Sequence, residues 1–303
     1  VAASVWIVLA GSSFCSAFAA RFLLGVGTAF SQISLATYQS MAFEERERGL
    51  AFSLIMAGGL APMMTIVPIA DWLLAHGCFT LYIIIPVLLT SAMAFLTVFV
   101  LNTEDVVLDS SHAAVNPLRG IGDCLKIPEL SLALFSMFLF SLTDAASAFM
   151  ASMTSSYGLM ASYFLSSNAV IGVLVRLFLG KVLDRYPRRR LSVPIIAGMS
   201  LMLLFASISP SRGSLMLLGV VFGVGMGFGF PLHLALVSDN APLRLQPQAI
   251  ALTWFLVAFD FALVPLTTSY ISGFTDPVTG FRAVVVFILA GAAYEAYLWR
   301  KLA

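Results

Sequence analysis

The sequence predicts an all-α integral membrane protein, and three observations support this prediction. Of its 303 residues, 60% are apolar and only 10% are charged, whereas soluble domains carry about 25% charged residues. Apolar runs long enough for a helix to cross a bilayer recur along the whole chain. The lysines and arginines gather in alternate breaks between these runs. Lipid must therefore be the solvent for much of the surface.

The apolar runs give the predicted helices in order. Residues 1–11 are too few to span a bilayer, so we expect the chain to begin inside a helix. Backbone groups in lipid must form their hydrogen bonds within the segment, which makes each longer run a helix. The longer runs lie at about residues 15–42, 49–74, 78–101, 130–156, 160–183, 191–209, 213–238, 247–273 and 281–300.

The long polar stretch at residues 102–129 divides these helices into two groups. It contains several acidic residues and Pro117 and Pro128. We therefore predict an N-terminal half at 1–101, a cytoplasmic central loop at 102–129 and a C-terminal half at 130–303.

The distribution of basic residues predicts the orientation of the helices. Twelve lysines and arginines fall in one set of alternate loops and the C-terminal tail, while only Arg212 and Arg282 fall in the other set. The richer set is expected to face the cytoplasm. The partial first helix then runs outward and the C-terminus lies inside.

A weak internal repeat supports the two halves. Leu23-Leu24-Gly25-Val26 matches Leu217-Leu218-Gly219-Val220, and the order of further short matches is kept along both halves. Duplicated halves are common among membrane transporters.

Enzyme signatures are missing from the sequence. It has no Walker loop, dinucleotide-binding glycine pattern, zinc-binding histidine pair or nucleophile elbow. The cysteines Cys15, Cys78 and Cys124 are odd in number and far apart, so we expect packing residues rather than a disulfide framework or a metal site. No enzyme activity, cofactor, metal or nucleic-acid partner is predicted.

The most distinctive local pattern reads Gly180-x-x-x-Asp184-Arg185-x-x-Arg188-Arg189. It resembles the loop after the second helix of the major facilitator superfamily, and the copy of that loop after the eighth helix. The resemblance implies a two-half bundle of twelve helices, of which this chain carries about ten, and a charged gate on the cytoplasmic face. The alternative is a plain basic anchor at the membrane surface.

A second resemblance to that family lies in Arg21-x-x-x-Gly25, early in its helix, where Gly25 is expected to serve helix packing. In the family this arginine is tied to proton coupling. Arg21 lies roughly two turns inside the membrane, where an unpartnered charge is costly. The alternative is that Arg21 extends its charge to the outer membrane surface.

Two carboxylates fall in the middle of predicted helices. Asp260 precedes Pro265 by five residues, where proton-driven efflux members of the family carry an aspartate, although the glycines of their motif are missing here. Asp144 is central in 130–156. Either can take up and release a proton in an apolar cavity. The alternative is an ion pair with Arg21 or Arg176 that only fixes packing.

Other residues receive simpler interpretations. Pro62 and Pro265 are expected to kink their helices. The five glycines between Gly219 and Gly229 predict close packing or a bend, and His233 a hydrogen-bonded packing residue. Asp239 and Glu295 lie near helix ends and are expected at the membrane interface. Four aromatic residues are candidates for a cavity lining: Phe135, Phe138, Phe149 and Tyr163.

The resemblance covers the chain from the family's third helix onward and implies alternating access driven by a proton gradient. Because the cavity holds few charges, we expect efflux of an apolar or amphiphilic small molecule. We expect the protein to be a monomer in the inner membrane of a bacterium. The alternatives are uptake of a small organic acid, bound by Arg21 or Arg176, and a truncated bundle that transports nothing.

Overall fold

The computed structural model describes residues 65–73, 76–100, 117–179 and 187–302, together with residues 15–31 except 17, 21 and 29. Within these ranges the chain forms helices joined by short turns and contains no strand. Contacts divide the chain into two compact units, residues 1–44 with 68–113 and residues 45–67 with 114–303. The predicted boundaries at 101 and 130 stay a prediction.

The first unit contains the helix α4, Phe79–Val100, with Pro86 inside it. Its hydroxyl groups bond back to the helix itself, since Ser91 Oγ donates to the Val87 carbonyl at 2.8 Å. This arrangement leaves no polar group of Ser91 to be satisfied by lipid.

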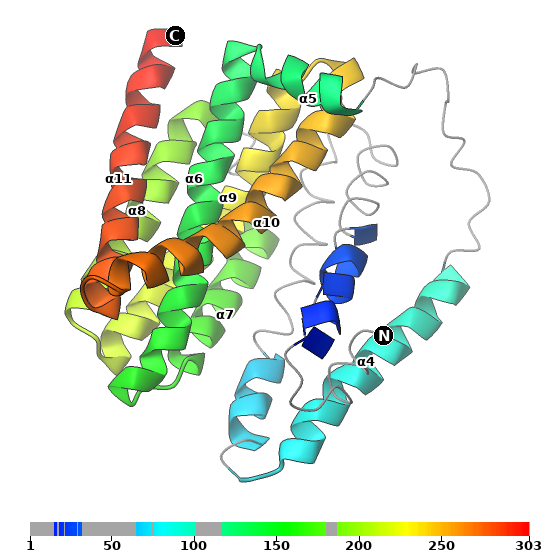
Figure 1. The fold of residues 1–303 in the computed structure, drawn as a ribbon, viewed down its shortest axis with the longest axis vertical. Coiled ribbons are helices and arrows are strands. Elements are labelled where there is room, and N and C mark those ends of the chain that lie inside the picture. The colour runs from blue at the N-terminus through cyan, green and yellow to red at the C-terminus, as the bar shows by residue number, and fades with distance from the viewer. Residues whose placement is uncertain are drawn as a thin grey trace. The chain divides into compact units, whose positions relative to one another are not determined.

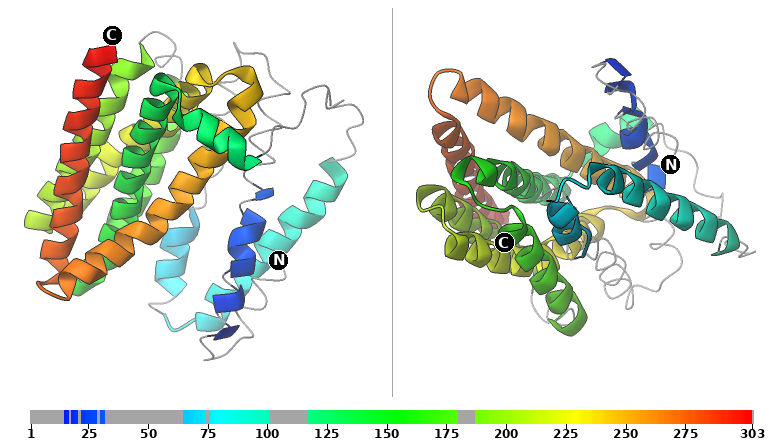
Figure 2. Two further views of the ribbon diagram at one scale, coloured as in Figure 1. Left: turned by 45° about the horizontal axis from the view of Figure 1, so that its top comes forward. Right: turned by 90° about the horizontal axis from the view of Figure 1, so that it is seen from below.

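The second unit holds seven labelled α-helices, of which α6 is the most buried span. Figures 1 and 2 show α6, α8, α9 and α11 side by side, with α10 crossing obliquely. The helices are α5 (Pro117–Leu125), α6 (Pro128–Met153), α7 (Ser162–Leu179), α8 (Arg188–Ile208), α9 (Arg212–Asn240), α10 (Gln246–Ser272) and α11 (Pro277–Leu302). Five of them, α6 and α8 to α11, are long and apolar enough to cross a bilayer.

The stretch predicted as a polar loop contains the helix α5. Its Cys124 side chain is fully buried in the core cluster of the second unit, and its thiol points to the Leu245 carbonyl at 4.0 Å. Burial and, second, the neighbouring Asp123 charge raise the pKa of the Cys124 thiol. The loop prediction missed this helix because only one of its faces packs against the bundle.

Many charged residues of the second unit lie at the end of the bundle that Figure 1 shows with α5 and the C-terminus. This end carries the start of α8 and the ends of α9 and α11. The opposite end carries Arg212, Arg282 and the Asp276 that begins α11. Within the described residues of this unit, the loops of the two predicted sets therefore lie at opposite ends.

Helix α11 begins at an aspartate cap at the sparsely charged end. Asp276 Oδ1 accepts from the backbone N–H groups of Val278 at 2.9 Å and Thr279 at 3.0 Å. The Thr279 hydroxyl donates to Oδ2 at 2.5 Å, and this bond is the largest cause that lowers the pKa of Asp276. The cap satisfies two donors that the first turn of a helix leaves open.

The glycines of α9 bring three neighbouring helices close, which confirms the packing interpretation. A methyl group on Gly223 would lie 2.6 Å from the Ile171 Cβ of α7. One on Gly219 would lie 2.6 Å from the Phe164 carbonyl oxygen, also in α7. A methyl group on Gly225 would likewise clash with Met199 of α8, and one on Gly229 would clash with Phe140 of α6.

Candidate functional site

Asp260 lies on the buried face of α10 and points toward α6. Its side chain is fully buried, and its Oδ2 accepts a hydrogen bond from the Ser141 hydroxyl. The other carboxyl oxygen, Oδ1, is also buried and has no hydrogen-bond partner among the described residues. A carboxyl group with one oxygen hydrogen-bonded and the other without a partner can still bind a proton or accept a further hydrogen bond.

Asp144 lies on α6 three residues after Ser141, and residues three apart face the same side of a helix. Its charge interacts with the guanidinium of Arg176 on α7. The Arg176 side chain is only 4% exposed and donates to the Met226 carbonyl oxygen of α9 at 2.9 Å. One turn of α6 therefore carries both the serine that binds the carboxyl group of α10 and a second carboxyl group whose charge interacts with Arg176.

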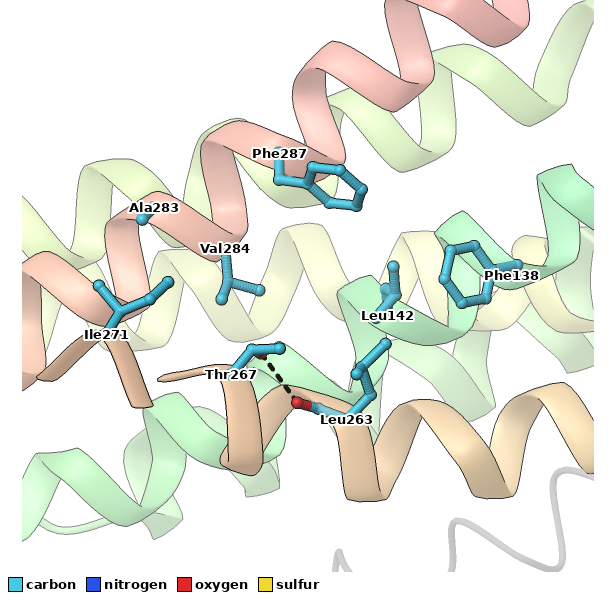
Figure 3. Close-up of a pocket in the computed structure, with 8 residues that line it drawn as sticks. All are labelled: Phe138, Leu142, Leu263, Thr267, Ile271, Ala283, Val284 and Phe287. Atoms are coloured by element: carbon cyan, nitrogen blue, oxygen red, sulfur yellow. Dashed lines mark hydrogen bonds between the residues drawn. The ribbon is translucent and has the colours of Figure 1, made fainter. Parts of the chain in front are cut away.

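An apolar pocket of about 330 Å³ lies between α6, α10 and α11. Figure 3 shows side chains of α6, α10 and α11 around it, with the Thr267 hydroxyl turned to the Leu263 carbonyl at 2.8 Å. The lining residues are Phe138, Leu142, Leu263, Thr267, Ile271, Ala283, Val284 and Phe287.

The carboxyl group and the pocket share their helix faces. Asp260, Leu263 and Thr267 follow the three- and four-residue spacing of one face of α10. On α6, Phe138 and Leu142 flank Ser141 along the chain. Asp260 and Ser141 do not line the pocket, but each lies within one helical turn of residues that do.

At the basic end, the two described arginines of the predicted gate contact the end of α9. Arg188 forms an ion pair with Asp239. Arg189 donates to the Asn240 side-chain oxygen at 3.0 Å, and its guanidinium lies 5.0 Å from the centre of the Trp299 ring. The start of α8 is therefore fixed to α9 and α11.

Comparison with known families decides what kind of protein carries this site. The sequence matches the family model of the Major Facilitator Superfamily over residues 1–265. The chain belongs to the Major Facilitator Superfamily. It is a multi-pass integral membrane protein and a secondary transporter, which confirms the predicted fold class and the coarse function.

A solved structure shows the same fold. The chain is similar to the Escherichia coli fucose:proton symporter FucP, with a TM-score of 0.69 and 11% sequence identity. The likeness covers 97% of this chain and 80% of the symporter. A comparison with curated proteins found no match.

Several predicted site residues of this major facilitator chain lie outside the described residues, and their roles stay predictions. They are Arg21, Pro62, Gly180, Asp184 and Arg185. Gly25 lies in a described helical segment and Pro265 inside α10. The roles predicted for these two residues, packing and a kink, likewise stay predictions.

The interfacial prediction did not foresee that Glu295 is buried. Its side chain is fully buried between helices, and its Oε1 accepts from the Ser192 hydroxyl at 2.9 Å and the Trp299 indole N–H at 3.0 Å. Proximity to a helix end misled the prediction, because α8 and its neighbours cover this part of α11.

The structure shows the contacts of His233 and of the four aromatic candidates. His233 is buried, its Nδ1 lies 2.7 Å from the Gly229 carbonyl, and its ring stacks on Phe140, as expected of a packing residue. Of the four aromatic candidates, Phe138 lines the pocket. The others contact ring or cation partners elsewhere: Phe135 with Tyr294, Phe149 with Phe281 and Tyr163 with Arg212.

Ser141 was missed by the sequence reasoning. The signal was present, because Ser141 precedes Asp144 by three residues and thus shares its helix face. The spacing alone does not tell that the hydroxyl faces Asp260, which is 119 residues away.

Proposed function

We propose that this transporter couples the inward flow of protons to the export of an apolar or amphiphilic small molecule. The observation that carries the proposal is the buried contact of Asp260 with Ser141, within one helical turn of residues that line an apolar pocket. Two helical halves would rock around this site and open it to each side in turn. We further propose that the chain works as a monomer in the inner membrane of a bacterium.

The two carboxyl groups are the proposed proton carriers. Ionisable groups inside a membrane bundle are costly and are most often kept for function. Asp260 has one buried oxygen without a partner among the described residues, so it can bind a proton there. Asp144, one turn along α6, is the second proposed carrier.

The pocket supports the proposed solute class. Its lining side chains are apolar apart from Thr267, whose hydroxyl is bonded within α10 to the Leu263 and Val264 carbonyls. Transfer of apolar groups from water to such a surface is favourable. The surface provides few polar groups that could bind a polyanion.

Uptake of a small organic acid is the second candidate. The similarity to a fucose:proton symporter favours considering import. Against anion binding, Arg176 already donates to the Met226 carbonyl and interacts with Asp144. The cytoplasmic gate proposed at Arg188 and Arg189 would serve either direction.

The test uses the chain in proteoliposomes that contain a pH-sensitive dye. Export coupled to proton entry is antiport, so an acidic interior should drive uptake of ethidium and acriflavine while protons leave. Asp260→Asn and Asp144→Asn should each abolish this coupled proton release. Asp276→Asn is the matched control, because this exposed cap residue keeps an oxygen acceptor as asparagine.

Three other results would contradict the proposal. Uptake of radiolabelled lactate or succinate driven by an acidic exterior, and lost in Arg176→Gln, would establish the importer instead. Unchanged dye uptake in both aspartate variants would exclude the carboxyl groups as carriers. No flux of any probe would favour a bundle without transport activity.

A further inference from the structure

Glu295 is a buried acidic residue that the proposed proton route does not use. It lies near the end of α11 with no exposed surface. Two donors that reach it, the Ser192 hydroxyl and the Trp299 N–H, bind the same oxygen, Oε1. Among the described residues no lysine, arginine or histidine forms an ion pair with it.

The Trp299 ring connects this carboxyl group to the gate. Its N–H is held by Glu295 four residues earlier in α11, and its face lies 5.0 Å beneath the Arg189 guanidinium. A cation over an indole ring is attracted by the electrons of the ring face. The orientation of the indole therefore sets where Arg189 can lie.

Helix α11 contacts the start of α8 at two points. Glu295 binds Ser192, and Trp299 supports Arg189, three residues earlier. Arg189 extends the connection to Asn240 at the end of α9. Two contacts one turn apart fix both the position and the rotation of α8 relative to α11, which a single contact does not.

We propose that Glu295 is a positioning residue for the cytoplasmic gate: it orients Trp299, and through it Arg189, so that the basic ends of α8, α9 and α11 move as one body. The inference rests on the proposed gate role of Arg188 and Arg189. Without an acceptor at position 295, the buried indole N–H loses its partner and turns toward water. Arg189 then loses the ring on which it lies.

The first test follows Trp299 directly. In the full chain with Trp6, Trp72 and Trp254 replaced by phenylalanine, fluorescence reports Trp299 alone. Glu295→Leu keeps the bulk but removes the acceptor, so iodide should quench the indole several-fold more strongly. Glu295→Gln keeps a carbonyl acceptor of similar size, so quenching should stay at the parent level.

The second test follows the two helix ends. Spin labels on cysteines at the exposed positions Arg190 and Arg300 should give one narrow distance distribution. Glu295→Leu should broaden it and Glu295→Gln should not. If Glu295→Leu does not fold, Trp299→Phe removes the N–H donor but keeps a ring, and the same broadening is expected.

These readouts do not depend on transport. Asp260→Asn should leave both unchanged, so failure of the proton-coupling proposal would not be mistaken for failure of this one. Equal quenching and equally narrow distances in the parent, Glu295→Leu and Trp299→Phe would overturn the positioning role. If Glu295→Gln raised quenching and broadened the distances as much as Glu295→Leu, the charge of Glu295 rather than its acceptor oxygen would be required. This result would also overturn the positioning role.

Discussion

At the scale of single residues, Ser141 determines how Asp260 is held. Its hydroxyl group donates to one oxygen of a fully buried carboxyl group, whose other oxygen has no hydrogen-bond partner among the described residues. Hydrogen bonds to charged groups in protein interiors contribute about 1.5–3 kcal/mol. A carboxyl group that must bind and release a proton in each cycle therefore depends on this serine.

Replacement of Ser141 tests this dependence. Ser141→Ala removes the donor, and we expect proton-driven dye uptake to fall by about tenfold, the factor that corresponds to a loss of about 1.4 kcal/mol. Ser141→Thr keeps a hydroxyl group and should retain most of the uptake. Initial rates in proteoliposomes measure both, and equal rates in the parent and Ser141→Ala would refute the expectation.

At the scale of elements, glycine spacing determines how close α9 lies to its neighbours. The stripe with Gly219, Gly223 and Gly227 faces α7, and each position lacks space for a Cβ. Close approach of two helices in lipid depends on such small residues, because van der Waals packing is a main source of attraction there. The contact also positions Arg176, whose guanidinium reaches across to α9.

Gly223→Ala is therefore expected to destabilise the bundle. The added methyl group would lie 2.6 Å from the Ile171 Cβ and 2.8 Å from the Asn168 carbonyl oxygen. Overpacking of this kind costs about 1–3 kcal/mol. Gly198→Ala in α8 is the control, since no heavy atom lies within 4 Å of the new methyl group. Thermal unfolding in detergent compares them, and equal midpoints would contradict the packing role.

At the scale of the whole molecule, the sorted basic residues predict its direction in the membrane. The second unit carries the starts of α8 and α10 and the ends of α9 and α11 at one end, and the Asp276 turn at the other. Loops rich in lysine and arginine stay on the cytoplasmic side during insertion.

Cysteine labelling checks this direction. In a background with Cys15, Cys78 and Cys124 replaced by serine, Lys301→Cys should react with an impermeant maleimide only after the membrane is opened. Thr275→Cys, in the turn before α11, should react on intact cells. The reverse pattern would overturn the predicted orientation, and therefore also the placement of the gate on the cytoplasmic side.

The sequence by itself determined that the chain is helical and lies in lipid. Backbone groups without water must bond within their own helix, so long apolar runs leave no other fold for segments such as 130–156 and 213–238. Both are helices in the structure, with ends that differ by a few residues. Asp144, Asp260 and Arg176 were also found this way, because a charge inside an apolar run is conspicuous.

Only the tertiary structure decided which of these residues meet. Asp260 accepts a hydrogen bond from Ser141, a partner that the sequence did not suggest, and Arg176 donates to the Met226 carbonyl of α9. It also decided that Glu295 is buried and that α5 is a helix. The physical reason is that helix periodicity fixes which residues share a face, whereas the partner of that face depends on how helices far apart in the chain pack against one another.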